Sequence, residues 1–300
     1  MEKILIAGGT GFVGEFLIKH LLICGYTIHV LMRRSAIIQA KNVRYFRWDI
    51  EKGYIEKDAF DGVTKIINLT GVTITEKRWT EKRKVEILES RTKAIDVLYK
   101  YVATLAIRID TFISSSATGY YGAVTTNEIF TETSVNGNDF LAFVCDQWEK
   151  AARQFESLGV TTVILRKGVV IGKGGGMYQK LTPLAKLGVN VSLGDGKQYL
   201  PWIDIRDLVS LYEFILQNDK IAGVFNVVSS QHITMNVFSK ALLRSFGKGS
   251  FLPNAPAFLI KLLLGEMGII LLTGSRVDNE KLKKTGFRLA YDAIENALQP

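Results

Sequence analysis

Short apolar runs alternate with longer segments of helical periodicity over the first part of the chain. The apolar runs have the length and composition of buried strands and lie at residues 4–7, 27–32, 43–48, 65–69, 111–115 and 161–170. Apolar positions recur at helical spacing between them, at residues 12–24, 80–105 and 141–158. Strands that alternate with helices predict βαβ units and a parallel sheet. Because right-handed crossovers stack such units, we expect an α/β fold with a doubly wound parallel sheet.

The later part of the chain has shorter elements. A helix is expected at about 207–217, and the apolar run at 223–228 predicts a strand that returns to the main sheet. Residues 229–300 contain short helical patterns that are separated by Gly and Pro, which end helices. We therefore divide the chain into a nucleotide-binding domain, 1–170, and a smaller, mostly helical substrate-binding part, 171–300.

The first candidate site follows the first predicted strand and opens the first predicted helix. Gly8 allows a tight turn, Gly11 lets a pyrophosphate approach the backbone, and Gly14 lets the helix pack closely on the strand. The free N–H groups at the start of the helix attract phosphate. The pattern predicts a Rossmann-type dinucleotide site, held by the residues of the turn, Gly8, Thr10, Gly11, Phe12, Val13 and Gly14.

The end of the second predicted strand distinguishes the two nicotinamide dinucleotides. Folds that bind NAD carry an Asp or Glu about 20 residues after the glycines, on the ribose hydroxyls. Arg33 and Arg34 occupy that place here, and no acidic residue is available. Two guanidinium groups can hold a 2′-phosphate through charge-assisted planar pairs. The alternative is a solvated pair of surface arginines. The pattern favours NADP(H) over NAD(H) as the cofactor.

Further candidates stand at the ends of the third and fourth predicted strands. In open α/β sheets, ligands lie at the carboxyl ends of the strands. Asp49 and Ile50 end the third strand, and we expect them to flank an adenine. Leu69, Thr70 and Gly71 end the fourth strand, where we expect them to lie along the ribose and the pyrophosphate.

Two more residues are expected to reach the same crevice. Ser114 ends the fifth predicted strand, beside the expected position of the nicotinamide. Arg91 lies on the long helix that follows the fourth strand, and it can reach inward from there. The alternative for Arg91 is that it belongs to a solvated charged face of that helix.

Composition and charge narrow the class of protein. The 300 residues are 47% hydrophobic and 22% charged, which is typical of a folded globular chain. The 38 Lys and Arg residues exceed the 29 Asp and Glu residues, which gives a formal net charge of +9. Because this excess is spread along the chain, we expect no nucleic-acid partner. The expected partner is a small-molecule substrate, and the sequence leaves a monomer and a homodimer open.

The rare residue types and the apolar runs exclude further classes. Cys24 and Cys145 are too few for a disulfide framework or a cysteine zinc site, and they favour a reducing, cytoplasmic compartment. The three histidines lie far apart in the sequence, so no metal site is expected. The most apolar stretch, 258–272, is interrupted by charged residues and falls short of a membrane span, so we expect no membrane partner.

Motifs of one family run along the whole chain. They are GGTGFVG at 8–14, NLTG at 68–71, KRW at 77–79, SR at 90–91, SSSATGYYG at 114–122, DFLAFVCDQWE at 139–149, LRKGVVIGKGGG at 165–176, GDGKQYLPWIDIRDLV at 194–209 and LLGEMG at 263–268. With these motifs the chain resembles the atypical, epimerase-like branch of the extended short-chain dehydrogenase/reductase family. The resemblance implies an NAD(P)-dependent oxidoreductase or isomerase that acts on a small substrate, with sugar derivatives among the candidates.

The resemblance also implies catalytic residues. Short-chain dehydrogenases use a Ser or Thr together with a Tyr–Lys pair in the motif YxxxK, where the lysine lowers the pKa of the tyrosine. Ser116 matches the serine, but Leu141 and Cys145 stand where the tyrosine and the lysine are expected. Tyr120 or Tyr121 is then the expected source of the proton, although Tyr121 matches a family position that is normally structural or lines the substrate.

Two functions of different classes stay open on this evidence. Ser116 and the elaborate C-terminal part favour an enzyme. The missing Tyr–Lys pair favours a non-catalytic sensor or scaffold that binds NADPH without turnover. Both hypotheses depend on the same dinucleotide site.

Overall fold

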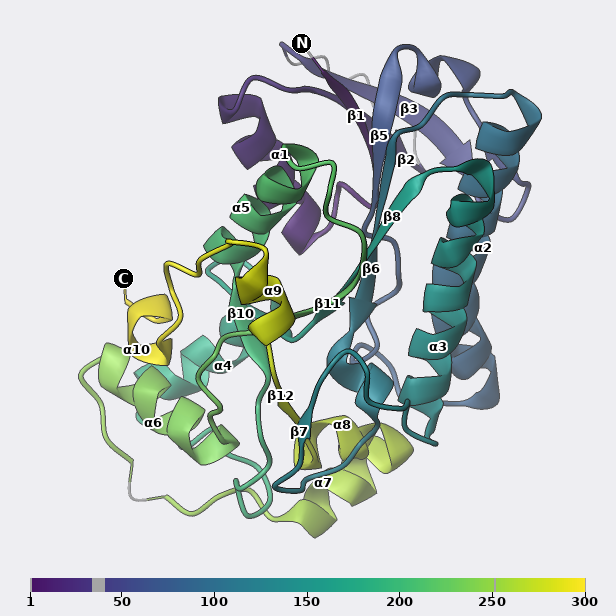
Figure 1. Cartoon of the computed structure of the whole chain (residues 1–300). Coiled ribbons are helices and arrows are strands. Elements are labelled where there is room, and N and C mark those ends of the chain that lie inside the picture. The colour runs from purple at the N-terminus through teal and green to yellow at the C-terminus, as the bar shows by residue number, and fades with distance from the viewer. Residues whose placement is uncertain (1, 34–40, 251, 300) are drawn as a thin grey trace.

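A central sheet of eight strands organises the computed structural model, which describes residues 2–33, 41–250 and 252–299 (Figure 1). The strand order is β11-β8-β6-β5-β1-β2-β3-β4. The strands are β1 (Lys3–Ala7), β2 (Thr27–Met32), β3 (Val43–Asp49), β4 (Tyr54–Ile55), β5 (Val63–Asn68), β6 (Thr111–Ala117), β8 (Thr161–Lys167) and β11 (Gly223–Val227). Every pair is parallel except β3 with β4. The doubly wound parallel sheet predicted from the sequence is confirmed.

Helices cover both faces of this sheet (Figure 1). One face carries α1 (Phe12–Ile23) and α5 (Ile205–Leu216), and the other carries α2 (Glu81–Thr104) and α3 (Phe140–Arg153). Successive side chains of a strand point to opposite faces. Ile4 and Ile6 of β1 therefore pack into the core on the α1 face, while Leu5 and Ala7 pack into the core on the α2 face. A strand buried on both sides has to be apolar throughout, which explains the continuous apolar runs of the sequence.

The remaining elements form a smaller body beside the carboxyl ends of the strands (Figure 1). It holds α4 (Gly176–Lys186), α6 (Met235–Ser245), α9 (Glu280–Lys284), α10 (Ile294–Ala297) and the two-stranded pairs β9 (Val169–Ile171) with β10 (Trp202–Asp204) and β7 (Ile129–Phe130) with β12 (Arg276–Val277). Its own core contains Trp202, Phe238 and Ile294. Between these elements the chain returns to the main sheet as β11, the edge strand beside β8.

Two elements that the sequence predicts as continuous, the strand at 161–170 and the helix at 141–158, are each two elements in the structure. The apolar run at 161–170 forms β8 and then β9, which belongs to another sheet. Gly168 lies between them, and a Cβ there would lie 2.5 Å from the carbonyl oxygen of Pro201. The predicted helix at 141–158 is α-helical only as far as Arg153 and then continues as a 3₁₀ helix, Gln154–Leu158.

The most apolar stretch of the sequence folds into short pieces. They are α7 (Ala257–Leu264), a 3₁₀ turn (Gly265–Gly268) and α8 (Ile269–Leu272). Within the described residues, every helix is too short or too polar to cross a lipid bilayer.

Candidate active site

The turn between β1 and α1 is built by glycine. Gly8 has a φ of +82°, and a Cβ there would lie 2.8 Å from the carbonyl carbon of Leu69. A Cβ on Gly14 would lie 2.6 Å from the backbone of Gly9, so the first turn of α1 can pack on the preceding turn only without a side chain there. Above Gly11, the nearest atom to an added Cβ is the carbonyl oxygen of Gly8 at 3.6 Å. The turn thus leaves an open cradle over its backbone.

The first turn of α1 offers free donors to that cradle. The helix starts at Phe12 with Gly11 as its N-cap, and no side chain caps it. The N–H groups of a first helical turn have no partner within the helix, and together they attract anions. Phe12 and Val13 direct their side chains into packing on the core, so their contribution to a phosphate site is that of their backbone.

A hollow of about 340 Å³ extends from this turn along the carboxyl ends of β1, β2, β3 and β5. We call it the glycine crevice. It brings together most of the residues predicted to bind the cofactor, namely Gly8, Thr10, Gly11, Arg33, Ile50, Leu69, Thr70 and Gly71. An adjoining hollow of about 270 Å³ shares Arg33 and Ile50 and adds Asp49. Arg34, the other predicted phosphate ligand, lies outside the described residues.

Arg33 supplies a positive charge at the rim of the glycine crevice. It is exposed, and among the described residues it has no ion-pair partner. Asp49 accepts a hydrogen bond from the backbone N–H of Lys52 at 3.1 Å. The guanidinium of Arg33 is therefore available to an anionic ligand.

Arg91 lies between the glycine crevice and a neighbouring pocket. Its Nη1 donates to the carbonyl oxygen of Ile87 at 2.8 Å, and its Nη2 donates to that of Val72 at 3.2 Å. Its guanidinium lies 3.0 Å from the place of a Cβ on Gly71 and 5.0 Å from the ring of Trp148. Burial lowers its pKa to about 10. Arg91 is thus directed inward, and the alternative of a solvated face is wrong for this residue.

The neighbouring pocket has a volume of about 310 Å³ and lies at the ends of β6 and β8. We call it the Lys167 pocket. Its walls are the turn after β6, one side of α3, the end of β8 and segments of the C-terminal part. Most of the side chains that line it are apolar, among them Ile74, Leu141, Val144, Trp148, Val169, Leu200, Pro201 and Ile270. Within the described residues, its only charged side chains are Arg91 and Lys167.

Lys167 is the last residue of β8 and turns its amine toward the neighbouring strand. Nζ donates to Ser115 Oγ at 2.8 Å. Ser115 Oγ lies 3.4 Å from the hydroxyl of Tyr212 on α5. Burial, and after it the charge of Arg91, lower the pKa of Lys167 to about 8. Lys167 was not among the predicted site residues, because it falls within a run that was expected to be one continuous strand.

The wall formed by α3 carries the two positions of the expected Tyr–Lys pair. An added Cβ on Gly119 would lie 3.5 Å from Leu141 Cβ and 3.7 Å from Cys145 Sγ, so both residues face the turn after β6. Burial raises the pKa of the Cys145 thiol to about 12, which keeps it protonated and weakly nucleophilic. This wall offers shape and apolar surface to a ligand.

Ser116 belongs to a buried ion-pair cluster. Arg166 and Glu149 form a two-pronged pair, with both N···O distances at 2.8 Å. Ser116 Oγ donates to Glu149 Oε1 at 2.7 Å. Ser114 lies buried on the same strand and donates to the carbonyl oxygen of Ser115. Neither Ser114 nor Ser116 lines the glycine crevice or the Lys167 pocket.

The two candidate tyrosines join the same cluster. The guanidinium of Arg166 stacks over the ring of Tyr120 at 3.3 Å. The hydroxyl of Tyr121 donates to Asn226 Oδ1 at 2.5 Å and accepts from Arg166 Nη1 at 3.1 Å. Burial raises the pKa of Tyr121 to about 12. In this geometry, Ser116, Tyr120 and Tyr121 contact the buried ion pair or its neighbours and do not line the Lys167 pocket. This placement disfavours the prediction that they act on a carbonyl.

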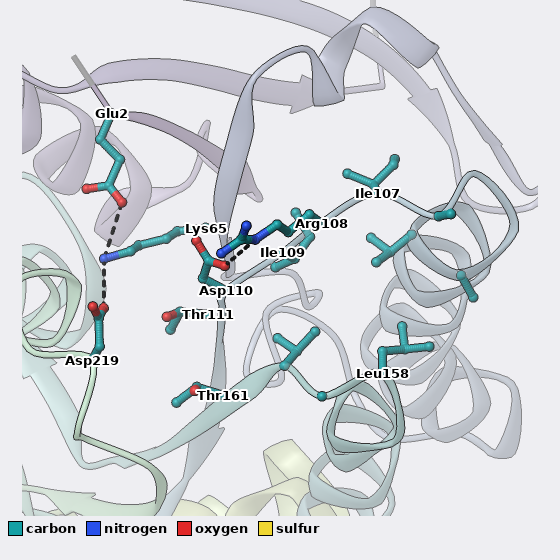
Figure 2. Close-up of a pocket in the computed structure, with 15 residues that line it drawn as sticks. Glu2, Lys65, Ile107, Arg108, Ile109, Asp110, Thr111, Leu158, Thr161 and Asp219 are labelled. Carbon is teal, nitrogen blue, oxygen red and sulfur yellow. Dashed lines mark hydrogen bonds and ion pairs between the residues drawn. The ribbon is translucent and has the colours of Figure 1, made fainter.

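A larger hollow of about 900 Å³ lies at the amino ends of the strands (Figure 2). Its charged groups are already paired: Lys65 Nζ lies 3.2 Å from both Glu2 and Asp219, and Arg108 pairs with Asp110 (Figure 2). Ligands of open α/β sheets bind at the other ends of the strands. We assign this hollow no role in binding.

One cluster of possible metal ligands lies on α1 and α5, apart from both sites. His20 Nε2 lies 2.7 Å from Glu213 Oε2, and the thiol of Cys24 lies beside them. Burial, and after it the hydrogen bond to Glu213, raise the pKa of Cys24 to about 11. Groups of this kind are common on protein surfaces without an ion, so we make no metal assignment for this cluster.

Family models and individual relatives both relate this chain to epimerase family proteins. Residues 4–227 match the model of the NAD dependent epimerase/dehydratase family, and residues 255–299 match a domain of unknown function, DUF1731. Epimerase family protein YfhF of Bacillus subtilis is 32% identical over 297 residues, which cover 99% of this chain and 96% of that protein. Epimerase family protein SA0724 of Staphylococcus aureus is 31% identical over 305 residues, which cover 100% and 98%.

Solved structures agree with that result. A human epimerase family protein, SDR39U1 (isoform 2) with NADPH, has a TM-score of 0.87 and 25% identity, and the match covers 99% of this chain and 98% of that chain. The nucleoside-diphosphate sugar epimerase from Corynebacterium glutamicum has a TM-score of 0.78 and 28% identity, over 99% of this chain and 57% of that chain. MoeE5 in complex with UDP-glucuronic acid and NAD, at 17% identity and a TM-score of 0.78, shows the shared fold alone.

Proposed function

The chain belongs to the NAD-dependent epimerase/dehydratase family, and on that premise we propose that it binds NADP(H) in the glycine crevice and transfers hydride to or from a small substrate in the Lys167 pocket. The two hollows meet at Arg91, which touches Gly71 on one side and lines the pocket on the other. A dinucleotide whose diphosphate lies on the glycine turn has its nicotinamide end directed toward the later strands of such a sheet. The substrate would then lie on an apolar, water-poor surface. If the hydride stays on the cofactor the reaction is an oxidoreduction, and if it returns to the same substrate it is an isomerisation.

The preference for the 2′-phosphate is supported by one observation above the others. Arg33 stands directly after β2, where NAD-binding folds have an acid, and its guanidinium has no ion-pair partner among the described residues. A carboxylate at this place would repel a phosphate, whereas a guanidinium forms a charge-assisted pair with it. That the human relative was solved with NADPH agrees with this proposal.

Titration calorimetry with both cofactors tests it. Arg33→Ala should weaken NADPH binding by at least about tenfold, which corresponds to about 1.4 kcal/mol or more for a lost hydrogen bond to a charged group. NADH binding should stay within twofold. Arg44→Ala is the matched control, because Arg44 is an exposed arginine of β3 that does not line the crevice. Unchanged NADPH affinity in Arg33→Ala would remove this residue from the site.

A sensor that binds NADPH without turnover is the second candidate. The observation that favours it is the apolar wall of α3, which includes Leu141 and Cys145, the residues that the sequence motif places at the positions of the Tyr–Lys pair. Single-turnover oxidation of bound NADPH by a panel of aldehydes and ketones separates the two functions. Loss of NADPH absorbance with any of them supports the enzyme, and tight NADPH binding without oxidation supports the sensor.

A further inference from the structure

Two partly buried cations face the Lys167 pocket, and neither has a counter-ion among the described residues. Arg91 and Lys167 both line the pocket, and no Asp or Glu is found among its described lining residues. Loss of solvent lowers the pKa of both side chains, and the positive charge of Arg91 lowers the pKa of Lys167 further. Burying one charge without a partner is costly, and burying two of the same sign side by side is more so. In the free protein the two positive charges therefore repel each other, and a bound anion would offset this repulsion.

The hydrogen-bond donors of these cations are incompletely used. An ammonium group has three N–H donors, and within the described residues the amine of Lys167 makes a single hydrogen bond, to Ser115 Oγ. In the part of the chain that the structure describes, Arg91 donates to neutral groups alone, the carbonyl oxygens of Ile87 and Val72 and the hydroxyl of Ser90. These contacts orient the two cations but do not neutralise them. Charge-assisted acceptors would have to come from a ligand.

The rest of the pocket selects against a polar ligand body. The lining is mostly apolar, and it includes Leu141, Val144 and Ile270. It also holds four hydroxyl side chains, of which Thr273 and Ser275 already donate to backbone carbonyl oxygens, which leaves those of Thr118 and Tyr199. A sugar ring would leave most of its hydroxyl groups unpaired there, at a cost for each. The volume of about 310 Å³ is at the low end of small-molecule sites, which span roughly 300–1,000 Å³.

We infer that the Lys167 pocket takes a small substrate with an apolar body and one carboxylate, and that the carboxylate lies against Lys167 and Arg91. The inference rests on the proposed function, which places the nicotinamide beside this pocket and so makes its occupant the substrate. It departs from the nucleotide-linked sugars named for the more distant structural neighbours. In this arrangement Lys167 and Arg91 position the substrate, and the wall of α3 excludes water from it.

Binding of matched acids and amides to the NADPH-saturated protein tests the inference. The probes are hexanoate with hexanamide and 3-phenylpropanoate with 3-phenylpropanamide, measured by calorimetry at pH 7. In each pair the shape is nearly the same and only the charge differs. We expect each acid to bind at least about tenfold more tightly than its amide, because charge-assisted hydrogen bonds are about twice as strong as neutral ones. Equal affinities within both pairs, or no binding of either acid at millimolar concentration, would overturn the inference.

Variants assign the effect to Lys167. Lys167→Met should remove the preference for the acid and leave amide binding within twofold. Lys167→Arg should keep at least part of the preference, because the charge stays. Lys173→Met is the matched control, since Lys173 is exposed and lies outside the pocket lining, and it should behave as wild type. A Lys167→Met protein that keeps the full preference for the acid contradicts the inference.

The failure of the cofactor proposal gives a different result. If NADPH produces no binding heat, the proposed function fails, while acid and amide titrations of the cofactor-free protein still report on the pocket. If Lys167→Met instead weakens NADPH tenfold and leaves acid binding unchanged, Lys167 contacts a phosphate of the cofactor, and the substrate inference is wrong.

Discussion

The glycine crevice and the Lys167 pocket both lie at the carboxyl ends of the strands, but the first is formed mainly by backbone and the second mainly by side chains. The crevice depends on backbone: the turn after β1 has no room for side chains, and the first turn of α1 presents bare N–H groups. The pocket depends on side chains from segments as far apart as Ile74 and Ser275. A site formed by backbone suits a ligand that many proteins share, because it does not depend on particular side chains. The specificity of a site formed by side chains changes with single substitutions. Under the proposed function, the side chains of the pocket would therefore determine which substrate is bound.

The largest effect is expected for the buried ion pair of Arg166 and Glu149, which lies outside both hollows. Arg166→Met leaves Glu149 as a buried carboxylate without its partner, and both side chains are at most 5% exposed. We expect the free energy of unfolding to fall by about 3–5 kcal/mol, as measured by urea denaturation. NADPH affinity should stay within a few fold in the folded fraction, because the crevice contains neither residue. A loss below about 1 kcal/mol would mean that the pair is not formed.

A substitution in the glycine turn should lower both stability and NADPH affinity. Gly8→Ala combines a positive φ with a clash against Leu69, and we expect it to cost about 2–3 kcal/mol of stability and to weaken NADPH binding. Gly25→Ala is the matched control: its φ is +87°, but nothing lies within 4 Å of an added Cβ. It should cost about 1 kcal/mol and leave NADPH binding intact. Equal effects of both variants would show that the crevice does not depend on close backbone approach.

Lys167→Met should stabilise the protein. Lys167 is partly buried and has no counter-ion among the described residues, so replacing it with an apolar side chain of similar length should raise the free energy of unfolding by about 2 kcal/mol at pH 7. Thermal unfolding without ligand measures this difference. A variant less stable than wild type would show that Lys167 has a counter-ion after all.

The stabilisation by Lys167→Met should also depend on pH. The pKa of Lys167 lies at about 8 in the folded protein and near 10.5 when unfolded. Between these values the unfolded state binds more protons, so the stability of the wild type rises with pH over this window. The advantage of the variant should therefore be full below pH 8 and should disappear toward pH 10.5. Stability curves that run parallel across the window would contradict the buried, uncompensated amine.

The smallest of these effects is expected for the predicted catalytic serine. Ser116→Ala removes one hydrogen bond to Glu149, which should lower the free energy of unfolding by about 1.5 kcal/mol. Once a substrate is found, kcat/KM should change less than twofold, because the hydroxyl faces the ion-pair cluster. Loss of a positioned acid or base costs about 10²–10⁴-fold, so a decrease of that size would return Ser116 to the reaction.

The crevice could be predicted from the sequence because its parts are local. Gly8, Gly11 and Gly14 lie within one turn, and Arg33 follows the next strand at a characteristic interval. Such spacing is imposed by backbone geometry and survives when the surrounding residues change. The alternating strands and helices were readable for the same reason, since each periodicity is a property of one segment.

The pocket could not be predicted in this way. The inward direction of Arg91 and the close pairing of Leu141 and Cys145 with Gly119 depend on packing between distant segments. Lys167 was hidden by Gly168, where the chain leaves one sheet for another because no side chain fits beside Pro201. Motif positions indicated Ser116 near the reaction, but which way a side chain turns at a strand end depends on its tertiary partners.

The return of β11 to the edge of β8 has a practical consequence for dissecting the molecule. β11 pairs with β8 along its full length, from Gly223 opposite Val163 to Val227 opposite Lys167. A fragment cut after residue 170 would lack β11 and so expose the hydrogen-bonding groups along the edge of β8. Exposed strand edges pair with other chains and promote aggregation. The fragment would also lose Phe287, which seals the apolar interior on the α1 face. We therefore expect that excising the amino-terminal half yields aggregates in place of a minimal dinucleotide binder.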